Sequence, residues 1–190
     1  MGINKLLNAA LQYAERGFVV APLLPHGKRA FKEPKMRIPT NDKNIIRNWW
    51  KSFPNANIGL PAAPEYNGLI IIDVDISYTN GNESLAKLLS DLRIVLPDTT
   101  VVRTGSGGLH YYFRHKGSPI ICCSHGRKLG IDIRANRGHA VAPPSIHKNG
   151  RAYELINGSF TNISEATKEV IQLALLVNDI NKKEAIILKE

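Results

Sequence analysis

The segment Leu69-Ile70-Ile71-Ile72-Asp73-Val74-Asp75 decides the fold prediction for this chain of 190 residues. Its four consecutive apolar residues, three of them β-branched, predict a buried strand. Side chains alternate between the faces of a strand, so Asp73 and Asp75 should point the same way, about 7 Å apart. Two carboxylates on one face repel each other unless a cation lies between them, and such oxygen ligands suit Mg²⁺ or Mn²⁺. The segment predicts either a divalent metal site or a strand that ends in two solvated acids.

The composition is that of a basic globular protein with one domain or two small lobes. Hydrophobic residues make up 43% of the chain, and no stretch approaches the roughly 20 apolar residues of a membrane span. Lys and Arg total 25 against 16 Asp and Glu, a net charge of +9, which favours a polyanionic partner, nucleic acid first. The adjacent Cys122 and Cys123 and an N-terminus without a signal-peptide pattern indicate a reducing, cytoplasmic location.

Periodicity and turn residues divide the chain into alternating helices and short strands. Helices are expected at 3–16, with Gly17 as C-cap, at 43–51, with Thr40 or Asn41 as N-cap, at 83–92 and at 163–177. Strands are expected at 18–21, where Pro22 stops the strand, and at 57–60, 69–75, 99–103, 109–114, 130–134, 139–142 and 153–155. Trp49 and Trp50 end an amphipathic helix and are expected in the core.

A Gly-rich turn and a third aspartate complete a set of residues suited to phosphate chemistry. Gly105–Gly108 lets backbone amides approach a ligand closely and cradle a phosphate. His110 begins the returning strand and is placed to donate to a phosphate oxygen, and Arg103 enters the turn with a positive charge. Asp132 shares a strand face with Arg134, as an ion pair or as a site. Three carboxylates beside a phosphate cradle fit phosphoryl or nucleotidyl transfer from a triphosphate.

These motifs, in this order, resemble the catalytic domain of bifunctional DNA primase/polymerases, the Prim-Pol branch of the archaeo-eukaryotic primase superfamily. The family's hydrophobic strand ending in DxD matches Leu69 to Asp75, its small-x-x-x-His motif matches Arg103 to His110, and its apolar-Asp strand matches Gly130 to Arg134. Weaker matches flank them at Gly27-Lys28, Trp49-Trp50, Asn55-Ala56-Asn57-Ile58-Gly59, Val141-Ala142-Pro143-Pro144-Ser145 and His147.

The resemblance implies an α+β fold of two lobes, with an RNA-recognition-like antiparallel sheet and an active site between the lobes. It assigns residues 1–160 to the catalytic domain and 161–190 to a C-terminal helix and tail that lead to a downstream region. The implied activity is template-directed nucleotidyl transfer, by a DNA primase or DNA-directed DNA polymerase that replicates a plasmid, phage or other mobile element. Its partners would be single-stranded or primed DNA, nucleoside triphosphates and a downstream or separate helicase.

The resemblance also implies residue roles. Asp73, Asp75 and Asp132 would hold two Mg²⁺ or Mn²⁺ ions, and these three with His110 would be catalytic. Nucleotide contacts would come from Ser106, Gly107, His110, Arg103, Lys28 and Arg134. Some relatives carry a zinc-binding insertion, but Cys122-Cys123, with His125 and His115 nearby, lacks Cys-x₂-Cys spacing, so zinc is not expected. Arg134-Ala135-Asn136-Arg137-Gly138 departs from the family's Arg-Gly-x-Gly-Gly, which puts a sugar-selecting role of this loop in doubt.

A basic loop is the candidate contact for the template. Lys28, Arg29, Lys32, Lys35 and Arg37 suit a clamp on a nucleic-acid backbone, with Phe31 available for stacking. The alternative is a solvated loop.

Three further alternatives stay open for the whole chain. One is a non-catalytic DNA-binding replication module with a primase-like fold, and another is a metal-dependent nuclease that uses the same acids. A glycosyltransferase interpretation of the DxD would leave the basic charge and the His unexplained.

Overall fold

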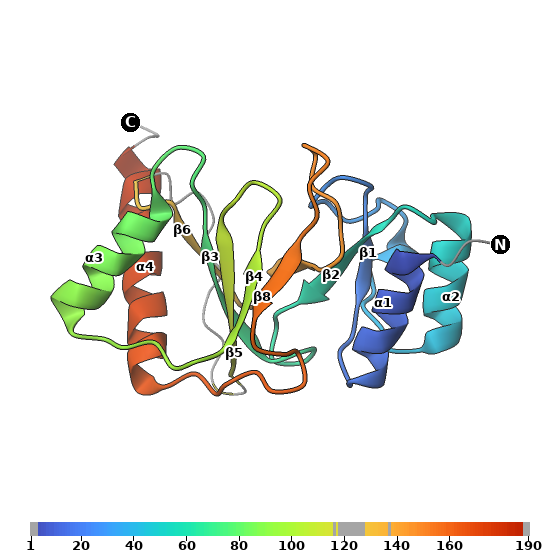
Figure 1. The fold of residues 1–190 in the computed structure, drawn as a ribbon, viewed down its shortest axis with the longest axis horizontal. Helices are drawn as coiled ribbons and strands as arrows, with labels where there is room; N and C mark the ends of the chain where they lie inside the picture. Colours follow the sequence, from blue (N-terminus) through green and yellow to red (C-terminus); the bar gives the residue numbers. More distant parts are fainter. Residues whose placement is uncertain (1–3, 116, 118–127, 137, 188–190) are drawn as a thin grey trace.

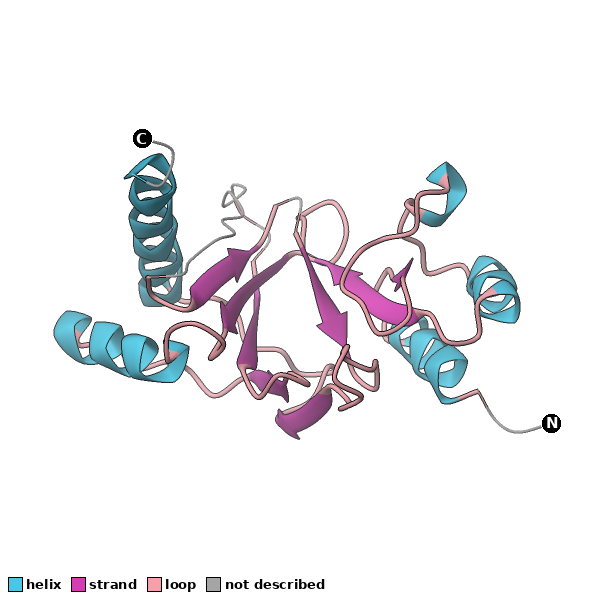
Figure 2. Cartoon of the chain, turned by 90° about the horizontal axis from the view of Figure 1, so that it is seen from above, coloured by secondary structure: helices cyan, strands magenta, loops and turns pink. Residues whose placement is uncertain are grey.

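The computed structural model describes residues 4–115, 117, 128–136 and 138–187. This part of the chain has a mixed α+β fold with two antiparallel sheets and four α-helices (Figure 1). Seen from above, the strands lie in the middle and the helices lie on the two outer flanks (Figure 2). In the described residues, no helix combines the length and the apolar character that crossing a membrane requires.

The larger sheet has the strand order β6-β3-β5-β4-β8. Its strands are β3 (Leu69–Val74), β4 (Thr100–Arg103), β5 (Leu109–Arg114), β6 (Ile131–Arg134) and β8 (Glu154–Asn157). One face packs on α3 (Gly81–Leu92) and α4 (Lys168–Ile187) through Ile70, Ile72 and Val74, while Leu69 and Ile71 of the opposite face belong to the second core. Burial on both faces explains why this strand is a continuous apolar run rather than an alternating one.

The smaller sheet has the order β1-β2-β7. It consists of β1 (Ala21–Leu23), β2 (Asn57–Pro61) and β7 (His139–Ala142), with α1 (Lys5–Glu15), α2 (Lys43–Ser52) and the short 3₁₀ helix η1 (Pro34–Met36) beside it. Trp49 and Trp50 are buried, which confirms their prediction as core residues. The strands predicted at 57–60, 99–103, 109–114, 130–134, 139–142 and 153–155 lie within one or two residues of the observed ones.

The strand expected at 18–21 was wrong, because β1 runs from Ala21 to Leu23 and contains Pro22. This strand lies at the edge of its sheet, where a residue without a backbone N–H is tolerated. The cap assigned to α2 was also wrong. Asp42 caps the helix, since its Oδ1 accepts from the amides of Asn44 at 2.7 Å and Ile45 at 3.2 Å.

The helix predicted at 163–177 begins later, at Lys168, and extends to Ile187. The residues before it pair with the end of β5, because the Arg114 amide donates to Ser164 O and the Ala166 amide donates to Arg114 O, each at 2.8 Å. Those backbone groups are therefore used by a strand contact, and the Thr167 hydroxyl then accepts from Val170 N at the helix start.

Asn57 joins the two loops that border the candidate site. Its side chain is fully buried, and Nδ2 donates to Gly27 O at 3.0 Å and to Ile146 O at 2.8 Å. Its Oδ1 accepts from Ile146 N at 2.9 Å. One side chain on β2 therefore fixes the loop after β1 and the loop after β7.

Replacing Asn57 with Ala should lower the free energy of unfolding by about 2–4 kcal/mol, because three partly buried backbone groups lose their partners. Urea unfolding followed by circular dichroism measures the effect. The matched control is Asn55→Ala in the same segment, since Asn55 is exposed. Equal stabilities of the two variants would contradict this role of Asn57.

Candidate active site

Three neighbouring strands place Asp132, Asp73 and His110 in one row across the larger sheet. Asp73 of β3 lies opposite Asp132 of β6 and opposite His110 of β5. Residues directly opposite one another in an antiparallel sheet share a face, so the three side chains come together. The residues come from distant parts of the sequence, and the register of β3 is what joins them.

The carboxylates of Asp73 and Asp132 share the guanidinium of Arg134. Arg134 Nε and Nη2 donate to Asp73 Oδ2 at 3.2 and 3.1 Å, and Nη2 donates to Asp132 Oδ2 at 2.7 Å. Arg134 lies on the same face of β6 as Asp132, which is two residues earlier in the chain, as the sequence predicted. In this arrangement the guanidinium of Arg134 balances the negative charge of the two acids.

His110 contacts the other oxygen of Asp73. Its Nε2 lies 3.3 Å from Asp73 Oδ1, and its Nδ1 is buried without a hydrogen-bond partner among the described residues. The ring packs near Tyr112 and Tyr153, with centroid distances of 6.1 and 6.0 Å. In this structure His110 therefore orients Asp73, and a direct contact with phosphate stays a prediction.

Sequence reasoning missed Tyr112 and Tyr153. Both hydroxyls are buried and lack a partner in the described part of the chain. Burial is the main reason that the pKa of each phenol is raised, and the negative charge of Asp73 raises it further. Tyr112 could have been found from its position two residues after His110, on the same strand face. Tyr153 has no local signal, because packing between distant segments places it there.

Asp75 follows β3 and is fixed by the surrounding backbone. Its amide donates to Gly130 O at 2.7 Å, and its carbonyl accepts from Gly81 N at 3.0 Å. A Cβ on Gly81 would lie 2.3 Å from Gly130 O, so only glycine permits this approach. The Asp75 carboxylate accepts from the amide of Ser77 at 2.8 Å and from its hydroxyl at 2.6 Å.

The Gly-rich turn between β4 and β5 packs tightly against its neighbours. A Cβ on Gly108 would lie 2.2 Å from Val74 O, and one on Gly105 would lie 2.3 Å from His147 Cβ. The Gly107 amide donates to Thr104 O at 2.9 Å and so closes the turn itself. Ser106 Oγ lies 2.9 Å from Thr104 Oγ1. The turn thus holds Ser106 at its tip, next to the residues around Asp75.

A cleft of about 350 Å³ opens beside these residues. Its lining comes from loops of both sheets: His26, Gly27, Lys28, Asp75, Ser77, Tyr78, Ser106, His147 and Lys148. The loop that carries Lys28 is fixed, because a ring N–H of His139 donates to Lys28 O at 2.7 Å. Arg103 lies outside the cleft lining and pairs with Glu154 at 3.5 Å, where both side chains are exposed.

The basic loop exposes Lys28, Arg29, Lys32, Lys35 and Arg37. None of the five forms an ion pair with a residue that the structure describes. The expectation that Phe31 is available for stacking was wrong, because its ring is buried and packs on Phe53 with a centroid distance of 4.6 Å. Its apolar ring anchors the loop to the core and leaves the cations outside.

The candidate ligand atoms are of the type that Mg²⁺ or Mn²⁺ binds. Carboxylate oxygens are suitable ligands for both ions, and Asp73 and Asp132 lie side by side. Within the described ranges, however, no three His, Cys, Asp or Glu side chains are grouped so that they could hold a metal. The donors therefore fit a divalent ion by type, while Arg134 holds the carboxylates in the present arrangement.

Most of the residues considered for a zinc site lie outside the described part of the chain. Cys122, Cys123 and His125 lie in 118–127, which the structure does not describe, and Arg137 is not described either. The His115 amide donates to Gly68 O at 2.8 Å.

The comparison with known families covers the part of the chain that contains these residues. The chain matches the family of the bifunctional DNA primase/polymerase N-terminal domain over residues 10–169. The match covers most of the chain, so the protein belongs to this family, and DNA primase/polymerase activity in general is what the family indicates. The search of curated proteins gave no match.

The charge of Asp73 should make stability depend on pH. Burial alone would raise the pKa of Asp73, but His110, Arg134 and Lys28 outweigh it and hold that pKa well below its ordinary range. The ionised carboxylate therefore stabilises the fold above the unfolded-state pKa of about 4, and this contribution falls as the pH decreases through the folded-state pKa.

Between about pH 5 and pH 2.5, the wild type should lose at least about 1 kcal/mol more stability than Asp73→Asn. Urea unfolding at each pH measures the difference. Asp91→Asn is the control, because Asp91 is exposed and pairs with Lys87 on the same helix. An Asp73→Asn profile as steep as that of the wild type would contradict the assignment.

Proposed function

We propose that the protein catalyses template-directed nucleotidyl transfer from nucleoside triphosphates, as a DNA primase, a DNA polymerase or both. The row of Asp132, Asp73 and His110 beside a cleft that contains Asp75, Ser106 and Lys28 carries this proposal. Family membership supports it independently. The replication context, a plasmid, phage or other mobile element, stays a prediction.

The cleft supports a two-lobed arrangement with the active site between the lobes. Lys28 follows β1, and His147 and Lys148 follow β7 of the smaller sheet. Asp75 follows β3, and Ser106 lies between β4 and β5 of the larger sheet. Each sheet thus supplies loops to one cavity.

The roles of the cleft residues follow from their charge and placement. Lys28 and Lys148 would neutralise the triphosphate, and the Ser106 hydroxyl would donate to a phosphate oxygen. His110 would keep the Asp73 carboxylate oriented through its Nε2. Arg134 would contribute positive charge for the triphosphate once it leaves the carboxylates. These are positioning and electrostatic roles, which account for most of the catalysis in phosphoryl-transfer chemistry.

Asp73, Asp75 and Asp132 would hold the divalent ions. Bound Mg²⁺ or Mn²⁺ would lower the pKa of the attacking hydroxyl and stabilise charge on the α-phosphate. Arg134, which donates to Asp73 Oδ2 and Asp132 Oδ2, would then make room for the ions.

Replacing Asp73, Asp75 or Asp132 with Asn should reduce nucleotide incorporation to background, because a neutral amide removes the charge that a divalent ion needs. The measurement is extension of a labelled primer on a template with Mg²⁺ or Mn²⁺, using deoxy- and ribonucleoside triphosphates, with a parallel assay without primer. Asp91→Asn is the control, and thermal unfolding verifies the fold. Incorporation at the wild-type rate by Asp73→Asn/Asp75→Asn would show that the metal assignment is wrong.

A second candidate is a non-catalytic DNA-binding module. The observation in its favour is the guanidinium of Arg134, which already balances Asp73 and Asp132 as a structural ion pair would. Such a module would bind DNA in the presence of chelator and would not depend on the aspartates. In the same assay, shortening of the labelled strand instead of extension would identify a nuclease.

The basic loop should determine the salt dependence of DNA binding. Replacing Arg29, Lys32, Lys35 and Arg37 with Gln should flatten the plot of log K against log salt by about 0.7 for each single-strand phosphate that the loop no longer neutralises. Fluorescence anisotropy with a labelled single strand measures it. The control removes four exposed lysines of α3 and α4, namely Lys87, Lys168, Lys182 and Lys183. Equal slopes for both variants would indicate a solvated loop.

A further inference from the structure

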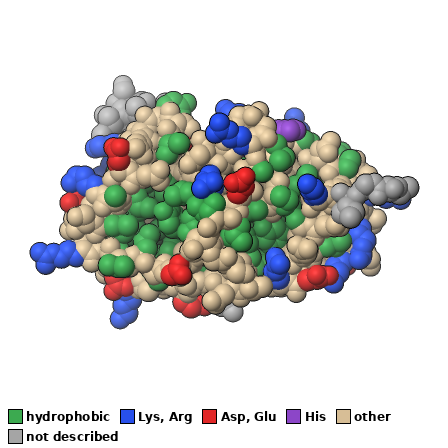
Figure 3. Space-filling model, in the orientation of Figure 1, with side chains coloured by type: hydrophobic (Ala, Val, Ile, Leu, Met, Phe, Trp, Pro, Cys, Tyr) green, Lys and Arg blue, Asp and Glu red, His purple; other side chains and the backbone are tan. Residues whose placement is uncertain are grey.

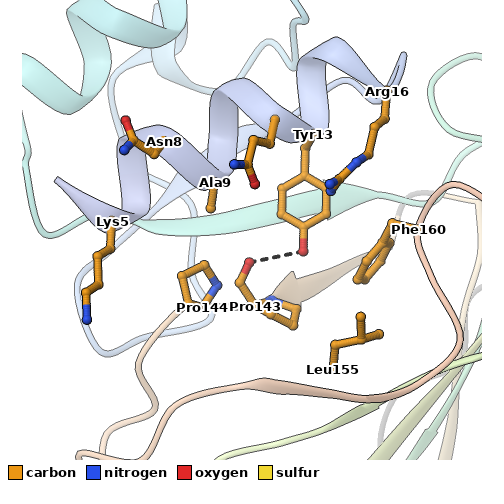
Figure 4. A pocket seen from close by; sticks show the side chains of 10 residues that line it. Lys5, Asn8, Ala9, Tyr13, Arg16, Pro143, Pro144, Leu155 and Phe160 are labelled. Carbon is orange, nitrogen blue, oxygen red and sulfur yellow. Dashed lines mark hydrogen bonds between the residues drawn. The ribbon is translucent and has the colours of Figure 1, made fainter. Parts of the chain in front are cut away.

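A second cavity, of about 410 Å³, lies along α1 and shares no lining residue with the cleft. One wall is the face of α1 that carries Lys5, Asn8, Ala9, Gln12 and Arg16 (Figure 4). The opposite wall is formed by Pro143, Pro144, Leu155 and Phe160, and Tyr13 lies between the walls. On the face shown in Figure 3, apolar side chains gather between the larger sheet and α1. We call this cavity the α1 groove.

Buried contacts between its two walls fix the shape of the α1 groove. Tyr13 Oη donates to Pro143 O at 3.0 Å, and the Tyr13 ring meets the Phe160 ring edge-on at 5.0 Å. Tyr13 and Phe160 are each 4% exposed. Because Tyr13 and Phe160 are buried, they support the groove from beneath. Its accessible apolar floor is formed by the half-buried Pro143 and Pro144 and the exposed Leu155. These contacts fix the floor, so a ligand would not need to order it.

The rim of the groove is positively charged. Lys5 and Arg16 are exposed at its two ends, and Asn8 and Gln12 are exposed between them. No acidic residue lines the groove, and neither cation forms an ion pair with a described residue. Cations at both ends of an apolar floor, with amides between them, suit an anionic ligand with flat apolar parts, as in a nucleic-acid strand.

The length of the groove indicates a strand rather than a single nucleotide. Arg16, the C-cap of α1, lies eleven positions after Lys5, which corresponds to about 16 Å along the helix axis. Stacked nucleotides rise about 3.4 Å each, so the two cations span several nucleotides.

The groove and the cleft share one segment of the chain. Pro143 and Pro144 line the groove, and His147 and Lys148 a few residues later line the cleft. The segment then returns through the buried Tyr153 to Leu155, which lines the groove again. Residues 143–155 thus contribute to both cavities, so one segment of the chain connects the cleft to the α1 groove.

We propose that the α1 groove binds single-stranded template DNA next to the catalytic cleft, with phosphates at Lys5 and Arg16 and bases against the apolar floor. The proposal rests on the proposed function, because template-directed synthesis requires a path for the strand. It adds a binding surface that is separate from the basic loop.

Two double variants test the groove without disturbing its floor. Lys5→Gln/Arg16→Gln removes the cations, and Asn8→Asp/Gln12→Glu introduces two negative charges at almost unchanged shape. All four side chains are exposed. The matched controls, Lys168→Gln/Lys183→Gln and Asn48→Asp/Gln172→Glu, make the same charge changes at exposed positions on α2 and α4.

Binding is measured by anisotropy of a labelled 20-nucleotide single strand in chelator, over a series of salt concentrations. Removing the two cations should raise Kd about tenfold relative to its control and reduce the salt slope by about 1.4. The acidic variant should bind more weakly than its own control. In primer extension, the groove variants should change the KM for DNA more than kcat.

If both groove variants bind the oligonucleotide as tightly as their controls do, the proposal is overturned, whatever else the groove binds. The two proposals fail separately. A wild type that binds the strand through the groove but incorporates no nucleotide would refute the proposed function alone, and unchanged binding with normal extension would refute the groove alone.

Discussion

The register of β3 against β5 and β6 is the constraint on which the rest of the structure depends. It aligns Asp73 with His110 on one side and with Asp132 on the other. A slip by one residue would turn the Asp73 side chain to the face that packs on α3 and α4, where Ile72 and Val74 now lie. A buried carboxylate there would lose Arg134 and His110 as partners, so the charge cluster and the apolar core specify the same register.

Local sequence patterns predicted most of the helices and strands, but contacts between distant residues could be seen only in the structure. The apolar run before Asp73 and the glycines before His110 carry their signals within a few residues. Tyr153 and the α1 groove depend on pairing between distant segments, and the start of α4 depends on backbone bonds to Arg114. Phe31 was expected to be available for stacking because it lies in a basic loop, yet its ring is buried in the core. Composition identifies a charged loop and does not show which of its apolar residues turn inward.

The two sheets act on one cleft because buried polar side chains fix the loops between them. Asn57 holds the loops that carry Lys28 and His147, and Ser145 Oγ accepts from Ile58 N at 2.8 Å. Buried polar groups need partners, so these bonds are satisfied only when the loops take the observed positions. The cleft is therefore specified by the same interactions that stabilise the smaller sheet.

The fold alone does not require the charge cluster formed by Asp73, Asp132, Arg134 and His110. Replacing a buried ion pair by apolar residues is often neutral or stabilising, so stability alone does not explain why acids occupy this sheet face. The same site also contains a histidine nitrogen and two tyrosine hydroxyls that lack partners among the described residues. Unsatisfied buried polar groups around a carboxylate with a strongly lowered pKa are typical of functional sites. The polar atoms without partners and the lowered pKa of Asp73 therefore support the proposed function, in which a ligand binds at this sheet face.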